Sequence, residues 1–338
     1  MKTKKLGTVA AVIAAVGLVG AAPANAKLKR INIGSNPAGS VYFLLAGGFA
    51  KMFQKQTKIR SVAQPHAGSS VYLPLMDVGE IVLGINSSLD SGMAFNGKAP
   101  FKQRHLGVKS LARVWILPYG YMTKESSGIK TIADFKGKRI VVNFRTNVSL
   151  GQLNRTILGT AGLTMNDVTA VVSGGVVAGI NMVVENRVDA VTVATGMPAM
   201  RKAHATVPGG LRMVSLPASA TDEQMAKGMP GSRTFIAKPN KRMGFIRGTT
   251  KIAAFDSFLN AGTTVKDEDA FMLTKALHEQ WPALQKAYGP IRATPQKGMS
   301  TPHNPMPYHP GAIKYWKSVS MWTATNEKQE NMLRATLK

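Results

Sequence analysis

The chain has 338 residues, with 43 Lys and Arg against 17 Asp and Glu, a formal net charge of +26 and no cysteine. The lack of cysteine excludes disulfide bridges and thiolate metal sites, so packing alone must stabilise the fold. A nucleic-acid-binding protein would carry a basic stripe with stacking aromatic side chains. The cations are instead spread along the chain, and we interpret them as a solvated surface that also steers an anionic ligand.

The first 26 residues have the layout of a secretory signal peptide. Three lysines precede the apolar run 6–22, and Ala24, Asn25 and Ala26 follow it. This is the order of a charged region, a hydrophobic region and a small-residue cleavage site. The run is shorter than the ~20 residues that span a bilayer. We expect cleavage after Ala26, a periplasmic location and no stable membrane anchoring.

Short apolar runs rich in β-branched residues then alternate with helical patterns, which is typical of α/β lobes with mostly parallel sheets. The predicted strands are Ile31–Ile33, Ile59–Ala63, Ile81–Ile85, Leu111–Leu117, Arg139–Asn143, Val168–Val172 and Val188–Ala194. After the fifth predicted strand, the apolar residues Leu150, Leu153 and Ile157 recur at helical spacing. Helices are also expected around Glu268–His278 and Ile313–Trp322.

We expect two lobes, because a chain of this length can hold two separate cores. The first crossing between the lobes is placed near Tyr119–Thr123 and the return near Gly248, just before another apolar run. Lobe 1 is then residues 27–118 plus 249–338, and lobe 2 is residues 119–248.

Three polar loops stand at the ends of predicted strands, where ligands of α/β sheets bind. They are Gly34–Ser40, His66–Val71 and Asn143–Ser149, and Asn86–Ser88 is a weaker fourth. Helix starts at such loops favour anions. For any single loop, plain helix capping is the simpler interpretation. Because both lobes carry such a loop, we favour a ligand cleft between them.

Arg145 is the sharpest signal in these loops. A guanidinium can hold a carboxylate through two parallel hydrogen bonds, which Lys cannot do. The other interpretation is a surface arginine of a very basic protein. Together with Thr146 and Ser149 of the same loop, Arg145 is the candidate anchor for an anion.

The sequence carries no motif for catalysis, for a metal or for a nucleotide. It has no Gly-x-Ser-x-Gly turn, no His pair at i,i+4 spacing and no phosphate-binding Gly-x-x-x-x-Gly-Lys-Ser/Thr loop. We therefore expect no enzymatic activity, no cofactor and no metal site. His309, before Pro310, is interpreted as part of a helix start.

Ordered motifs over nearly the whole mature chain resemble the TAXI group (TRAP-associated extracytoplasmic immunogenic proteins), the receptors of tripartite ATP-independent periplasmic (TRAP) transporters. The motifs are Ile33–Ser35 with Gly39–Tyr42, Gly79–Gly84, Gly128–Arg139, Arg187–Ala190 and the closing His309–Tyr315.

The resemblance implies a type II-like periplasmic binding protein, a monomer whose lobes close over a small anionic organic solute. That solute would be a carboxylate or an amino acid such as glutamate, delivered to the integral membrane permease of a TRAP transporter. A receptor that signals to a membrane sensor kinase remains an alternative. By family position, ligand contacts would come from the loop that opens the first helix of lobe 2 and from Gly39, Ser40, Tyr42, Ser69, Asn86 and Ser87.

Three departures from the family pattern concern the identity of the ligand. Where the family has a Gly-Ser-Gly loop, this chain has Phe144–Ser149, so that the side chains of this loop would replace a cradle of backbone amides. Tyr72 stands where Asn is common, and Phe43 replaces the second Tyr of a pair.

Overall fold

The computed structural model describes residues 28–337, so the predicted signal peptide lies outside the described residues. The strands are β1 (Arg30–Ser35), β2 (Arg60–Pro65), β3 (Leu83–Ser87), β4 (Lys109–Lys124), β5 (Arg139–Phe144), β6 (Thr169–Ser173), β7 (Ala190–Ala194), β8 (Leu211–Met213), β9 (Ser232–Ala237) and β10 (Thr250–Ala261). The longer helices are α1 (Val41–Thr57), α2 (Ser69–Asp77), α3 (Ser88–Phe95), α4 (Ser149–Gly159), α5 (Val176–Val184), α6 (Pro198–Thr206), α7 (Asp222–Gly228), α8 (Asp267–Glu279), α9 (Trp281–Ala287), α10 (Pro310–Ser318) and α11 (Ala324–Ala335).

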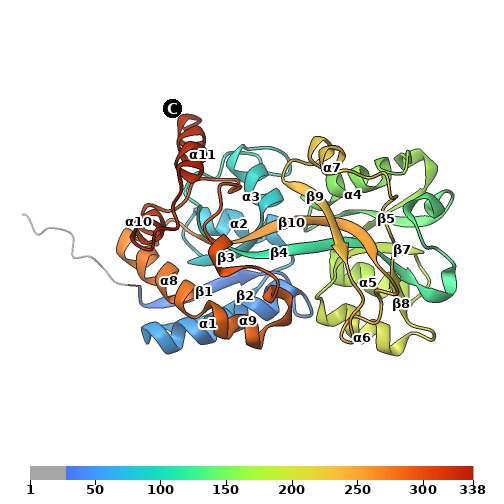
Figure 1. The fold of residues 1–338 in the computed structure, drawn as a ribbon, viewed down its shortest axis with the longest axis horizontal. Coiled ribbons are helices and arrows are strands. Elements are labelled where there is room, and N and C mark those ends of the chain that lie inside the picture. Colours follow the sequence, from blue (N-terminus) through green and yellow to red (C-terminus); the bar gives the residue numbers. More distant parts are fainter. Residues whose placement is uncertain (1–27, 338) are drawn as a thin grey trace, which may run out of the picture.

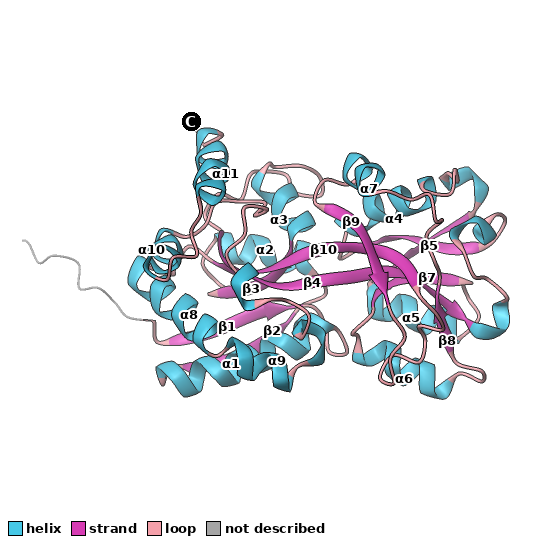
Figure 2. Ribbon diagram, viewed as in Figure 1, coloured by secondary structure: helices cyan, strands magenta, loops and turns pink. Residues whose placement is uncertain are grey.

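The strands form one mixed sheet that extends through two halves of the molecule (Figure 1). In the first half, β1 pairs parallel with β2 and β3, and in the second half β5 pairs parallel with β6 and β7. The long strands β4 and β10 are antiparallel to each other and run from one half to the other (Figure 2). The predicted two-lobed α/β fold is confirmed, with helices on the faces of a sheet that is mixed because these two crossing strands are antiparallel.

The seven predicted strands correspond to β1–β7, whereas β8, β9 and β10 were not predicted as strands. Strand β10 is buried along almost its whole length. Because it is buried on both faces, its apolar residues do not alternate with polar ones but stand in blocks around the buried Asp256 and Ser257, and periodicity cannot distinguish such a pattern from a helix. The lobe boundaries remain a prediction, since both crossing strands belong to both halves.

The predicted helix Ile313–Trp322 lies too far toward the C-terminus. The corresponding helix α10 begins at Pro310 and ends at Ser318. The chain then turns at Ser320, whose φ of 55° is left-handed. The interpretation of His309 as part of a helix start is confirmed. It is the N-cap of α10, and its side chain accepts a hydrogen bond from the backbone N–H of Gly311.

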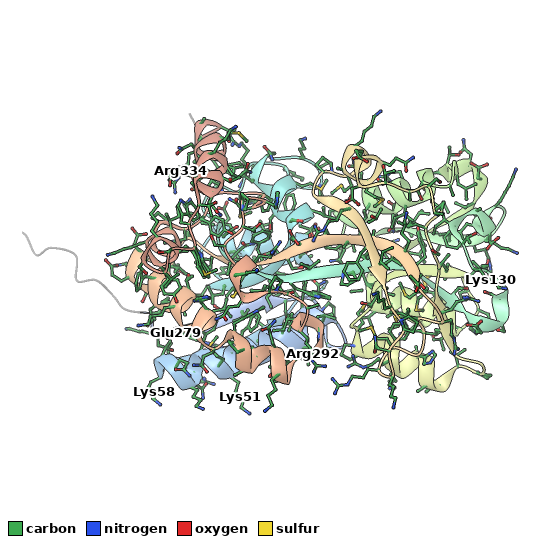
Figure 3. The ribbon with its side chains drawn as sticks, viewed as in Figure 1. Lys51, Lys58, Lys130, Glu279, Arg292 and Arg334 are labelled. Carbon is green, nitrogen blue, oxygen red and sulfur yellow. The ribbon has the colours of Figure 1, made fainter. Side chains whose placement is uncertain are left out.

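Apolar side chains form a continuous core through both halves, and Trp115, Trp281 and Trp316 are fully buried in it. The charged side chains stand out from the surface on both halves, as Lys51, Lys58 and Lys130 show (Figure 3). This distribution agrees with a solvated basic surface.

Candidate functional site

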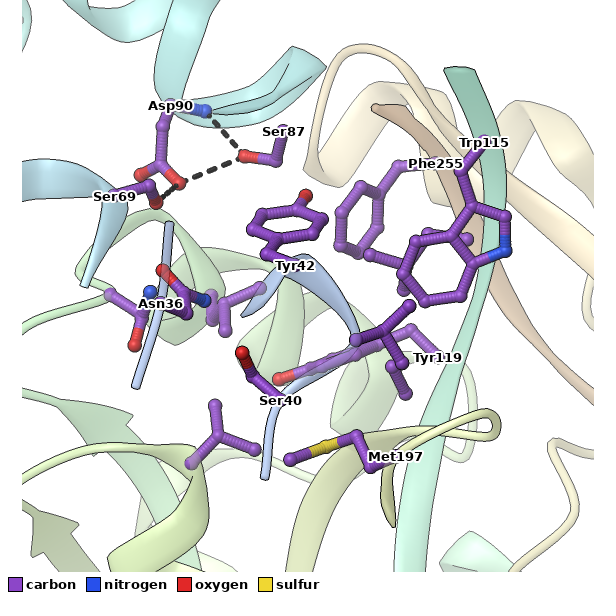
Figure 4. Close-up of a pocket in the computed structure, with 16 residues that line it drawn as sticks. Asn36, Ser40, Tyr42, Ser69, Ser87, Asp90, Trp115, Tyr119, Met197 and Phe255 are labelled. Carbon is purple, nitrogen blue, oxygen red and sulfur yellow. Dashed lines mark hydrogen bonds between the residues drawn. The ribbon is translucent and has the colours of Figure 1, made fainter. Parts of the chain in front are cut away.

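A small cavity of about 60 Å³ lies between the two halves. It is found at the carboxyl ends of the parallel strands, where the topology of α/β sheets places ligands. Its lining comes from both halves and from the crossing strands, and consists of Asn36, Ser40, Val41, Tyr42, Ser69, Ser87, Asp90, Trp115, Leu117, Tyr119, Asn147, Leu150, Val176, Ala194, Met197 and Phe255 (Figure 4).

The loop after β1 brings Ser40 and Tyr42 to this cavity. Gly39 has a φ of 89°, a left-handed conformation that favours glycine, and it turns the chain into α1. Ser40 is the N-cap of α1, and its hydroxyl accepts a hydrogen bond from the backbone N–H of Phe43 at 3.1 Å. Tyr42, in the first turn of α1, lies with its hydroxyl 2.9 Å from that of Ser257 on β10.

Asp90 on α3 is the only carboxylate among the lining residues, and it is 2% exposed. Its Oδ2 accepts hydrogen bonds from the hydroxyls of Ser69 and Ser87, the latter at 2.8 Å (Figure 4). Its Oδ1 accepts a hydrogen bond from the Ser70 hydroxyl at 3.3 Å. The Ser87 hydroxyl also accepts from the backbone N–H of Asp90 and thereby caps α3. Three serine hydroxyls from two helix starts therefore fix one buried carboxylate.

Aromatic rings line the same cavity as this carboxylate. Tyr42 and Trp115 meet edge to face with ring centroids 6.2 Å apart, and Tyr119 and Phe255 lie 5.6 Å apart. Burial, with a smaller contribution from the Asp90 charge, raises the pKa of both tyrosines well above the usual value. Both rings thus stay protonated and can donate hydrogen bonds through their hydroxyls.

The loops of the two halves touch next to the cavity. The Gly39 carbonyl accepts a hydrogen bond from the backbone N–H of Ala199 on α6 at 3.2 Å. The backbone N–H of Val148 donates to the Ser70 hydroxyl at 3.4 Å. A Cβ atom added to Gly68 would lie 1.9 Å from the Thr146 carbonyl oxygen, so only glycine allows this approach.

Four of the predicted site residues, Ser40, Tyr42, Ser69 and Ser87, line the cavity. The other five do not. Gly39 lies at the contact between the halves, Thr146 lines a neighbouring recess, and Asn86 and Ser149 are fully buried. The side chain of Arg145 is exposed, and from its loop Asn147 reaches the cavity instead. The role of Arg145 as an anchor remains a prediction.

The sequence analysis missed Asp90, Asn36, Asn147 and Phe255. A signal for Asp90 was present, because Ser87-x-x-Asp90 has the spacing of a capping box at a helix start. It identifies a carboxylate near a strand end, although it does not reveal that this carboxylate is buried.

A wider groove of about 730 Å³ opens where β4, β9 and the loops around Gly196 and Pro290 meet. Trp115 lines both spaces, whereas its neighbours Ile116 and Pro118 line only the groove. No acidic side chain lines the groove, and its cations are Arg201, Lys238, Lys241, Arg242 and Arg292. The inner cavity, by contrast, is lined by no Lys, Arg or His.

Within residues 28–337 no helix combines the length and apolar character needed to cross a membrane. No group of three or more His, Asp or Glu side chains in this part of the chain could hold a metal ion.

The model of the NMT1-like family matches residues 33–319. Among solved structures, a protein from Bordetella bronchiseptica RB50 is 15% identical, with 88% of this chain and 90% of that chain covered and a TM-score of 0.50. PhnD1 from Prochlorococcus marinus in complex with methylphosphonate is 14% identical (74% and 82% covered, TM-score 0.49). The alkanesulfonate-binding protein SsuA from Xanthomonas axonopodis pv. citri, bound to MOPS, is 17% identical (90% and 84% covered, TM-score 0.45). No curated protein matches the chain. At these identities the likeness to solved structures concerns the fold alone.

Proposed function

Because the chain belongs to the NMT1-like family, whose members are periplasmic solute-binding proteins, we propose that it captures a small organic solute between its two halves and delivers it to a membrane transporter. The observation that carries this proposal is the small cavity of about 60 Å³ between the halves, which is lined by polar and aromatic residues of both halves. Such a cavity is complete only when the halves approach each other.

Capture then follows from the contacts that a solute makes with both halves. A ligand that binds the closed form better than the open form shifts the population toward closure. The crossing strands β4 and β10 connect the halves, and bending of such a connection is the usual basis of hinge closure. The touching loops at Gly68 and Gly39 are the contacts that closure would complete.

The solute we propose is a carboxylate or an amino acid such as glutamate. A carboxylate group has suitable partners at the start of α1, where the Ser40 hydroxyl lies next to free backbone N–H groups of the first helical turn. The side chain of Asn36 and, from the other half, that of Asn147 add polar partners. These contacts would take the place of the anchor that the sequence analysis assigned to Arg145, Thr146 and Ser149.

The transporter we propose is a TRAP-type permease, as the resemblance to the TAXI group implies. The basic groove, which is formed by residues of both halves, offers a surface for an acidic part of such a permease. Uptake of the identified solute by vesicles that contain the permease, with and without this protein, tests delivery. Uptake that is independent of the protein would favour the sensing alternative.

The experiment that tests capture is a thermal-shift screen of carboxylates, amino acids, sulfonates and phosphonates. A solute at a hundred times its dissociation constant should add about 2.7 kcal/mol to the free energy of unfolding. Small-angle scattering of the same samples should show a smaller radius with the solute. If neither the screen nor mass spectrometry of the natively purified protein reveals a solute, the proposed function is wrong.

Export is tested separately, by recovering the protein from the periplasm and sequencing its N-terminus. We expect the mature chain to begin at Lys27. A cytoplasmic protein that retains Met1 would contradict the proposed location.

A further inference from the structure

The charge of the cavity does not match the charge of the protein. Lys and Arg outnumber Asp and Glu by 43 to 17 in the chain, yet the cavity lining contains one carboxylate, that of Asp90, and no basic side chain. A cavity built for an anion alone would be expected to use some of this abundant positive charge. The lining therefore favours a solute that is not simply anionic.

Asp90 lacks a cationic partner within residues 28–337. Its carboxylate is held by three serine hydroxyls, and no ion pair with Lys, Arg or His is found there. An ionised carboxylate offers about four acceptor positions, so that a further donor can still bind. Burying a carboxylate without a positive partner costs free energy that a bound cation would recover.

The surrounding groups suit the same kind of solute. The aromatic rings of Tyr42, Trp115, Tyr119 and Phe255 line the same cavity as Asp90, with Tyr42 on the Asp90 side (Figure 4), and the faces of such rings attract cations. The side-chain oxygen of Asn36, on the same lining, is buried and has no hydrogen-bond partner among the described residues. It can accept a hydrogen bond from a nitrogen of the solute.

We infer that the solute carries a positively charged nitrogen, which pairs with Asp90 beside the aromatic rings. This inference rests on the proposed function and narrows its solute class. Amino acids and small amines match the chemistry of this lining, whereas carboxylates without a nitrogen do not. For an amino acid, the ammonium group would lie at Asp90 and the carboxylate group near the start of α1.

Matched compounds test the inference on the unmodified protein. The melting temperature with glutamate is compared with that with glutarate. Each other amino acid is compared in the same way with the carboxylic acid that lacks only its amino group, and aliphatic amines are tested as well. We expect at least one nitrogen-bearing compound to raise the melting temperature and its partner without nitrogen to have a much smaller effect. If carboxylates without nitrogen raise it as much or more, the inference is wrong although the proposed function stands. If no compound binds and no solute co-purifies, both are wrong.

Two variants then locate the cation. Asp90→Asn keeps the shape and removes the charge, and it should weaken binding of the nitrogen-bearing solute by about 30-fold or more in titration calorimetry, since truncating a buried charge pair has effects of this size. The Asn variant should discriminate much less than wild type between the solute and its analogue without nitrogen. Asp267→Asn, at an exposed acid outside the cavity, is the control and should bind as wild type. Unchanged discrimination in Asp90→Asn would overturn the inference. If that variant does not fold, the compound comparison on the wild type decides.

Discussion

The hydroxyl oxygens of Tyr42 and Ser257 lie 2.9 Å apart, and their hydrogen bond joins helix α1 to the crossing strand β10. Both side chains are buried, and the Tyr42 ring is also part of the cavity lining. The position of this ring therefore depends on the strand that connects the two halves. A change in either residue should affect both stability and binding.

Removing this hydrogen bond should destabilise the protein measurably. Tyr42→Phe leaves the Ser257 hydroxyl buried without its partner, and a loss of about 1–3 kcal/mol in the free energy of unfolding is expected. Urea unfolding of Tyr42→Phe, Ser257→Ala and the double variant measures the coupling. We expect the double variant to lose less than the sum of the single variants. Strict additivity would show that the two hydroxyls do not interact.

Gly68→Ala should weaken solute binding without damaging the fold. The backbone of Gly68 is extended, with a φ of 177° that any residue adopts, so alanine introduces no backbone strain. Its Cβ would nevertheless lie 1.9 Å from the Thr146 carbonyl oxygen of the other half. The halves would have to separate slightly, which shifts the population toward the open form.

The measurement for Gly68→Ala is solute affinity together with the scattering radius. Gly47→Ala is the matched control, because a Cβ there meets no atom within 4 Å. We expect the control to bind as wild type, and Gly68→Ala to bind more weakly and to show a larger radius with solute. Equal affinities in all three proteins would argue that closure does not use this contact.

Asn147 and Arg145 provide a direct comparison between the structure and the sequence analysis. Asn147 is 4% exposed and lines the cavity, whereas the side chain of Arg145 is exposed. We expect Asn147→Ala to weaken solute binding by about tenfold, the value of one lost hydrogen bond to a charged group. Arg145→Ala should change it little. A larger loss in Arg145→Ala would restore the guanidinium as the anchor of the solute.

Acidification should destabilise the protein through His309. Its Nδ1 accepts a hydrogen bond from the Gly311 N–H, and its Nε2 donates to the Val265 carbonyl at 3.0 Å, so the neutral ring fits the site. Burial lowers the pKa of this histidine from the usual 6.5. The unfolded chain therefore takes up the proton first as the pH falls. The stability that His309 contributes is present above pH 6.5 and is lost as the pH falls toward the lower folded value.

Thermal unfolding between about pH 7.5 and about pH 5.5 measures this contribution. The melting temperature of the wild type should fall over this range, and His309→Gln should show a smaller fall from a lower starting value. His303→Gln, at an exposed position, should behave as wild type. An identical pH dependence in His309→Gln would assign the effect to other groups, such as the half-buried His66 and His278, whose pKa values partial burial also lowers.

The features that could be predicted from the sequence are those that depend on local chemistry. The loop Gly34–Ser40 was predicted correctly as the start of a helix, since the serine cap and the glycine turn need only neighbouring residues. The loops that carry Ser69 and Ser87 were found from similar local chemistry, whereas the choice of these two residues came from the resemblance to the TAXI group.

The remaining features depend on contacts between distant parts of the chain. Phe255 reaches the cavity because β10 lies antiparallel to β4, with Phe255 opposite Leu117. The sequence contains no local sign of this register. The same limit applies to the orientation of Arg145, because the direction of a loop side chain depends on the packing of the segments around it.

The position of β10 has a consequence for how the protein is made. This strand lies between β3 and β4 in the sheet, yet more than 120 residues separate its start from the end of β4 along the chain. The sheet of the first half therefore cannot be completed until Thr250–Ala261 has been synthesised. Pairing over such sequence distances makes folding slow. A nascent chain whose first half is still incomplete at this point is a suitable substrate for export as an extended polypeptide.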